Sequence, residues 1–174
     1  DIRDEYLKLM YRPSFKQQYA VDFSGGTEKS TWYFSTGYDN NINESYANYE
    51  RFNLSFQNTY QPLPKLKLSS GLRFTSSKNT KGRTKYGDVR MVNSELPPYT
   101  QFLDDNGEFL PIPITYRKSF LDSVGGGRLL DWNYYMDDYL NVSNIAKLNN
   151  ILVNVGANYS FTKRLNFDIK YQLE

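Results

Sequence analysis

The stretch Tyr49-Glu50-Arg51-Phe52-Asn53-Leu54-Ser55-Phe56-Gln57-Asn58-Thr59-Tyr60 decides the fold class, because apolar and polar residues alternate along it. Successive side chains of a β-strand point to opposite faces, so this segment would have one apolar face and one polar face. It is also long enough to cross a bilayer, which takes about 9–11 residues of a tilted strand. The pattern therefore indicates a piece of a membrane β-barrel.

Five other segments alternate in the same way, which predicts an all-β fold of six antiparallel strands in a meander. The additional strands are expected at 15–24, 31–38, 66–76, 147–161 and from 165 onward. The connections expected between the strands alternate between short turns, at 25–30, 61–65 and 162–164, and longer segments, at 39–48 and 77–146. In outer-membrane barrels short turns lie on the periplasmic side and long loops lie outside, so this alternation favours a barrel.

Charge follows the same division between the two predicted faces. On the apolar faces only Glu50 and Lys147 are charged, and each stands at a strand end beside a longer connection. A cation at the bilayer midplane costs about 2–4 kcal/mol, so this distribution is typical of a lipid-facing surface. A soluble β-sandwich also excludes charge from its inner face, and a secreted glycan-binding sandwich is the alternative interpretation.

Composition excludes several classes of function. The chain of 174 residues contains no Cys and no His, which excludes disulfides, the usual zinc sites and imidazole chemistry. Its net charge of +2, without a block of like charge, gives no indication of nucleic-acid binding. No cofactor and no enzymatic activity are expected. The charged start at Asp1 is no signal peptide, so an exported form would be mature or internal here.

Several motifs resemble those of SusC/RagA-like TonB-dependent outer-membrane transporters, and they occur in that family's order. In the strands the resemblance is carried by 24–29 (SGGTEK), 32–38 (WYFSTGY) and 68–75 (LSSGLRFT). In the long connection it is carried by 98–99 (PY), 103–107 (LDDNG), 110–112 (LPI), 116–122 (YRKSFLD) and 129–134 (LLDWNY).

The resemblance implies a fragment of a barrel of about 22 strands with an N-terminal plug. Such a protein lies in the bacterial outer membrane and imports glycan or peptide fragments. It works with a SusD-like surface lipoprotein and is driven through TonB, which contacts a region absent from this chain. Residues 1–14 would end an extracellular loop, 15–76 would form four barrel strands, 77–146 one long extracellular loop, and 147–174 two more strands.

Candidate contact residues fall into two groups. Tyr99, Tyr134, Tyr135 and Tyr139 lie in the long connection, where aromatic rings can stack on sugars or on a partner protein. The alternative is that aromatic residues there, Trp132 above all, form the loop's own small core. The second group, expected to face the barrel lumen or the plug, is Arg51, Arg73, Asp168 and Lys170. Salt bridges without a ligand role are the alternative for this group.

Two acidic clusters in the long connection are interpreted structurally. Asp131, Asp137 and Asp138 have the composition of a glycosidase carboxylate pair, but solvated loop acids are far commoner. The segment 104–108 (DDNGE) resembles part of a calcium loop, yet the position that should carry the final Glu is Thr115. Asn106-Gly107 between apolar pairs predicts a hairpin turn instead.

Overall fold

The computed structural model describes residues 1–128 and 133–174, which form two compact units. The sheet unit comprises Phe15–Asn41, Asn48–Asn79 and Ile145–Glu174. The loop unit comprises Asp1–Ser14, Ile42–Ala47 and Thr80–Asn144. The chain thus passes several times between the units, and each unit is held together by contacts between segments distant in sequence.

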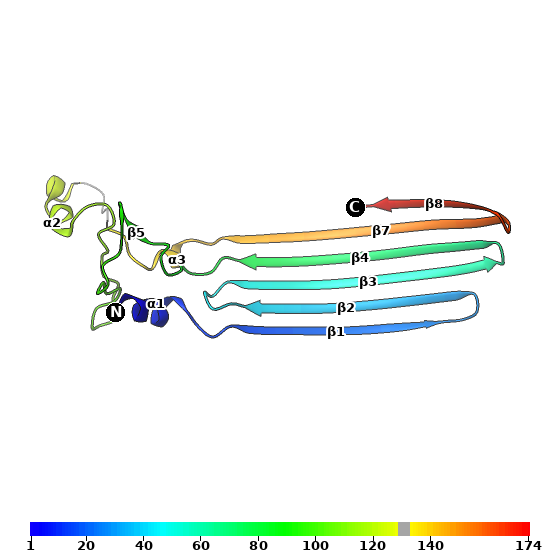
Figure 1. Ribbon diagram of the computed structural model, residues 1–174, viewed down its shortest axis with the longest axis horizontal. Helices are drawn as coiled ribbons and strands as arrows, with labels where there is room; N and C mark the ends of the chain where they lie inside the picture. The colour runs from blue at the N-terminus through cyan, green and yellow to red at the C-terminus, as the bar shows by residue number, and fades with distance from the viewer. Residues whose placement is uncertain (129–132) are drawn as a thin grey trace. The chain divides into compact units, whose positions relative to one another are not determined.

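The sheet unit is built on six antiparallel strands, as predicted, and each is hydrogen-bonded to the next of these six along the chain (Figure 1). The strands are β1 (Phe15–Gly26), β2 (Ser30–Ile42), β3 (Asn48–Leu63), β4 (Leu66–Thr80), β7 (Ile145–Thr162) and β8 (Leu165–Leu173). Their order in the sheet is β1-β2-β3-β4-β7-β8. This is a meander in which the segment between β4 and β7 adds no strand to the sheet.

The predicted strand ends were wrong, because most strands continue through polar residues that had been assigned to connections. The connection predicted at 39–48 is only 43–47, since β2 runs on through Asp39 to Ile42. The long connection predicted at 77–146 is 81–144. The short turns shrink to 27–29, 64–65 and 163–164. Backbone pairing does not depend on side-chain polarity, so a polar run can extend a strand.

Cross-strand contacts fix the register and hence which residues share a face. In the β7–β8 pair Val155 lies opposite Tyr171 and Gly156 opposite Lys170. Between β4 and β7, the Ser76 hydroxyl is 2.7 Å from Asn149 Oδ1. The same pair of strands continues into a backbone hydrogen bond from Lys81 N to Asn144 O, 3.0 Å. The register is thus continuous to the strand ends.

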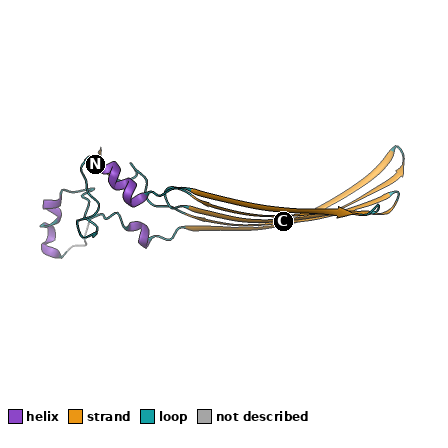
Figure 2. Ribbon diagram, turned by 90° about the horizontal axis from the view of Figure 1, so that it is seen from below, coloured by secondary structure: helices purple, strands orange, loops and turns teal. Residues whose placement is uncertain are grey.

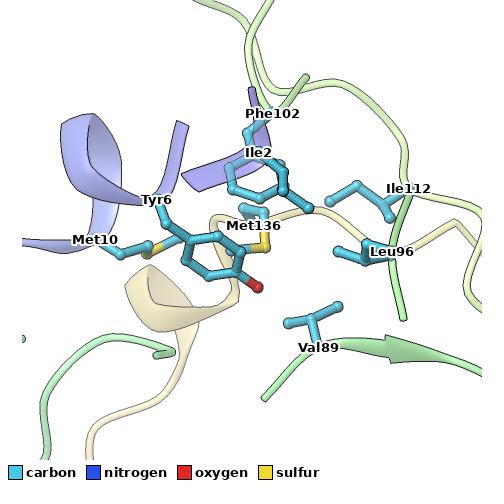
Figure 3. Close-up of a cluster of buried hydrophobic side chains, with 8 residues drawn as sticks. All are labelled: Ile2, Tyr6, Met10, Val89, Leu96, Phe102, Ile112 and Met136. Atoms are coloured by element: carbon cyan, nitrogen blue, oxygen red, sulfur yellow. The ribbon is translucent and has the colours of Figure 1, made fainter. Parts of the chain in front are cut away.

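The loop unit has its own hydrophobic core, shown in Figure 3. Its first element, α1 (Ile2–Met10), begins with a capping box in which the Asp1 side chain accepts from Asp4 N. Ile2, Tyr6 and Met10 lie four residues apart, so they share one face of the helix, and all three are buried. The core is completed by residues of the long connection: Val89, Leu96, Phe102, Ile112 and Met136.

The rest of the loop unit consists of short elements. These are the two-stranded pair β5 (Arg90–Met91) and β6 (Ser94–Glu95), the helices α2 (Lys118–Leu121) and α3 (Asp138–Asn141), and the 3₁₀ turn η1 (Val124–Gly127). The predicted Asn106-Gly107 turn is confirmed: Asp104 N donates to Glu108 O at 2.9 Å, and Gly107 has φ +85°. Leu103 and Phe109 form the bridge that closes it.

The five-residue connection 43–47 is fixed by contacts within the loop unit. Asn43 Oδ1 accepts from Ser45 N and Ala47 N, each at 3.0 Å, which forms a compact turn. The Arg83 guanidinium stacks over the Tyr46 ring, 3.7 Å from its centroid, and donates to Leu9 O at 2.6 Å. Arg83 thereby ties the turn to the end of α1.

Within residues 1–128 and 133–174, no helix combines the length and the apolar character that spanning a membrane requires.

Candidate functional site

The first candidate surface is the apolar face of the sheet, which we call the apolar face throughout. Aromatic pairs on neighbouring strands meet on it: Phe23 and Phe34 have ring centroids 6.3 Å apart, and Phe52 and Phe74 6.2 Å apart. Its exposed members are Phe15, Tyr19, Val21, Phe23, Trp32, Tyr38, Phe52, Phe56, Tyr60, Leu68, Leu72, Ile151, Val155, Phe161, Leu165, Phe167, Ile169, Tyr171 and Leu173.

No residue of the sheet unit forms a second layer over this face. The exposed fraction is 37% for Phe52 and Phe56 and 54% for Ile169. The buried hydrophobic residues that the structure describes all belong to the core of the loop unit. Seen edge-on in Figure 2, the strands form a single layer. Long apolar side chains across six strands are therefore available to an apolar partner or solvent.

Charge is confined to one end of the apolar face. Glu50 and Lys147 lie there, as the sequence indicated, in the parts of β3 and β7 that adjoin the longer connections. Lys78 joins them, because β4 continues beyond the end predicted for it. From the alternation and the observed register, the remaining length of the face carries only apolar and uncharged polar residues.

The opposite, polar face carries the four residues predicted to line a lumen, and two of its ion pairs involve them. Arg51 of β3 bonds Asp39 of β2, with Nη2 2.7 Å and Nε 2.8 Å from Oδ2. Asp39 is only 9% exposed. Asp168 and Lys170 form an exposed pair along β8, 3.6 Å apart. The fourth, Arg73, is exposed and has no ion-pair partner in the described part of the chain.

Further hydrogen bonds between side chains link neighbouring strands on this face. The Tyr33 hydroxyl donates to Asp22 Oδ1 at 3.0 Å, and Thr75 donates to Asn53 Oδ1 at 3.2 Å. Sequence reasoning missed these pairs, because partners on neighbouring strands are set by register and not by local spacing. The polar face thus combines hydrogen bonds between neighbouring strands with exposed charged side chains. Such a face is suited to contact with water.

The four candidate tyrosines of the long connection do not form one surface. Tyr99 is 88% exposed. Tyr134 and Tyr139 are half-buried against the core, and Tyr134 forms a bridge with Ile112. Burial raises the pKa of Tyr134 above its ordinary value. Tyr135 is half-buried as well.

Tyr134 and Tyr139 therefore serve the core of the loop unit, which was the alternative interpretation, and Tyr99 alone is fully presented to solvent. The motif residues Asp131 and Trp132 lie outside the described residues.

In the long connection, the acidic residue Asp104 has a structural role. The Asp104 carboxylate accepts backbone N–H groups of Glu108 and Asn106, each at 2.9 Å, and the Glu108 bond contributes most to lowering its pKa. It therefore closes the Asn106-Gly107 turn. In the described ranges no group of three or more acidic, His or Cys side chains is arranged to hold a metal ion.

No protein-family model matches the chain, and no curated protein is significantly similar to it.

Proposed function

We propose that this chain is a segment of the barrel of a SusC/RagA-like TonB-dependent transporter in the bacterial outer membrane. The observation that carries the proposal is the apolar face, which no residue of the sheet unit covers. Soluble proteins rarely expose contiguous apolar patches larger than a few hundred Å². Contact with hydrocarbon removes that cost, and the ordered motifs of the strands and the long connection support this family.

The dimensions of the apolar face suit a bilayer. From Phe52 to Tyr60 the β3 backbone advances about 26 Å, close to the ~25 Å height of the apolar band of outer-membrane barrels. The charged residues of this face lie beyond one end of that stretch: Glu50 on β3 itself, Lys78 on β4 and Lys147 on β7. Depth-dependent insertion costs favour this placement, since a charge near the interface costs almost nothing.

In this proposal each face has a separate role and the chain performs no chemistry. The polar face, with Arg51, Arg73, Asp168 and Lys170, borders the water-filled interior. The long connection is extracellular, where the exposed Tyr99 is available to a glycan, a peptide or a SusD-like lipoprotein. The free edges of β1 and β8 pair with further strands, because unpaired backbone groups in hydrocarbon cost several kcal/mol each.

A soluble β-sandwich gains no support from the described residues. Its inner face must pack against a second sheet about 10 Å away. Apart from the six-stranded sheet, the described strands are β5 and β6, which have two residues each and belong to the loop unit. Neither can cover an apolar face that extends across six strands.

The proposal is tested by neighbouring substitutions on opposite faces of β3. Phe56 lies on the apolar face and Gln57 on the polar face, and both are exposed. In the natural full-length protein, Phe56→Arg should reduce the amount assembled in the outer membrane, since it costs about 2–4 kcal/mol at the midplane. Gln57→Arg, the matched control, should assemble normally.

Assembly is measured as protein that resists a urea wash of isolated outer membranes and is released by detergent. A wild-type protein recovered in the soluble fraction, without detergent, would exclude the transporter assignment. Equal effects of the two substitutions would show that the apolar face does not contact lipid.

A further inference from the structure

The three short turns of the sheet unit form a continuous row at one end of the sheet (Figure 1). Backbone hydrogen bonds join each turn to the next hairpin: Gln61 N donates to Lys29 O at 2.7 Å, and Ser160 N donates to Lys65 O at 2.8 Å. The side chains of the turns 27–29, 64–65 and 163–164 therefore project from neighbouring positions along one edge.

This row is strongly basic. The turns contain four cations, which we call the basic turn row: Lys29, Lys65, Lys163 and Arg164. The one acidic residue in the turns is Glu28. All four cations are exposed, and in the described residues none of them has an ion-pair partner. Lys65 Nζ has only a long contact, 3.5 Å, with Phe161 O. At the other end of the strands the charges are of both signs, since Glu50, Lys78 and Lys147 lie there.

The basic turn row directly adjoins the apolar face. Leu165 follows Arg164 and is 59% exposed, and Phe161 precedes the same turn on that face. Along the strands, apolar side chains are followed at the turns by cations without an ion-pair partner in the described residues. A phospholipid in a bilayer has the same order along the membrane normal, with its acyl chains in the interior and its phosphate at the surface. Each Lys or Arg beside an anionic membrane surface contributes about 1 kcal/mol, a factor of about five in binding.

We infer that the basic turn row binds the phosphate groups of anionic phospholipids in the leaflet that the short turns face. The inference rests on the proposed function, because it requires the apolar face to lie in a bilayer. It goes beyond that function by assigning a lipid preference to one end of the sheet. A zwitterionic headgroup satisfies it less well, since its own ammonium group opposes the cations.

The test locates lipids beside Leu165. A photoreactive benzophenone amino acid replaces Leu165 in the natural full-length protein, which is reconstituted in vesicles of equal phosphatidylglycerol and phosphatidylcholine. After illumination, mass spectrometry counts the adducts of each lipid. We expect phosphatidylglycerol adducts to exceed phosphatidylcholine adducts about fivefold. This is the factor expected when one cation of the row contacts the phosphate of the anionic lipid. In 1 M salt, where the Debye length is about 3 Å, the excess should largely disappear.

Two charge variants make the test specific. The variant Lys29→Gln, Lys65→Gln, Lys163→Gln and Arg164→Gln should give nearly equal adducts. Its control, Lys78→Gln, Lys81→Gln, Lys85→Gln and Lys147→Gln, removes the same charge elsewhere and should retain the excess. A second probe position at Ile151, ten residues from Phe161 along β7, should show no excess that depends on the basic turn row.

The outcomes separate this inference from the proposed function. Equal adducts of the two lipids in the wild type, or an excess unchanged in the variant that lacks the four cations of the basic turn row, would overturn the inference. An absence of any lipid adduct at both Leu165 and Ile151 would contradict the transporter proposal itself.

Discussion

At the scale of the residue, Tyr6 makes the loop unit sensitive to alkaline pH. Its side chain is 2% exposed, and its hydroxyl has no hydrogen-bond partner among the described residues. Burial raises its pKa from 10.0 to about 12. Between these values the unfolded chain loses the proton while the folded one keeps it. The free energy of unfolding is therefore unaffected below about pH 10 and falls as pH rises toward 12.

The substitution Tyr6→Phe tests this dependence. It should abolish the part of the alkaline decline due to this residue, up to about 2 kcal/mol. Near pH 7 it should leave the loop unit at least as stable, because an unsatisfied buried hydroxyl is removed and the ring keeps its edge contacts with Phe102 and Tyr86. Denaturant unfolding at several pH values between 7 and 12 measures both effects. Tyr99→Phe, at an exposed site, should retain the full decline; a Tyr6→Phe curve parallel to wild type would refute the assignment.

At the scale of the element, the pair Arg51–Asp39 joins β2 to β3 near their polar ends. Arg51→Ala leaves the largely buried Asp39 carboxylate without its partner. We expect a loss of about 1–2 kcal/mol, since the Arg51 side chain itself is partly exposed to water. Faster amide hydrogen exchange in β2 and β3 would report that loss. Arg73→Ala, on the same face without an ion-pair partner in the described residues, should change exchange little; equal effects would show that the pair contributes nothing.

The elements also show what local sequence can and cannot predict. Alternation identified six strands, because the period of two is a geometric property of the extended backbone. Strand ends were missed at Asp39 and Lys78, where pairing continues through polar residues. For the candidate site, the alternation of side chains along a strand predicted which face carries Arg51 and Arg73. It did not predict the ion-pair partner of Arg51. Cross-strand partners depend on register, which no local pattern contains.

The core of the loop unit was the least predictable part. Tyr6 meets Phe102 with ring centroids 4.9 Å apart, although the two residues are far apart in the chain. No periodic pattern links such partners, so Tyr134 and Tyr139 could be candidate contact residues as readily as core residues. In a segment with little regular structure, long-range packing decides which side chains are buried. Only the structure therefore distinguishes a core residue from a contact residue there.

At the scale of the whole molecule, the proposed function places the two units in different solvents. The loop unit buries a cluster of eight hydrophobic residues, which is the arrangement that water favours. The described residues of the sheet unit bury almost none of their large apolar side chains. In the proposed function these side chains meet hydrocarbon, where no hydrophobic gain is needed because every internal backbone group is paired within the sheet.

This difference predicts that damage to the core of one unit should leave the other intact. Phe102 is fully buried, and Phe102→Ala should destabilise the loop unit by about 3–5 kcal/mol through lost burial and a new cavity. Tyr99→Ala, an exposed aromatic three residues earlier, is the matched control and should have little effect. Hydrogen exchange of the protein in detergent should show faster exchange in α1 and around Ile112 while β1 to β4 keep their protection. If Phe102→Ala also exposed the amides of those strands, the sheet would depend on the loop core, and lipid contact could not be its main source of stability.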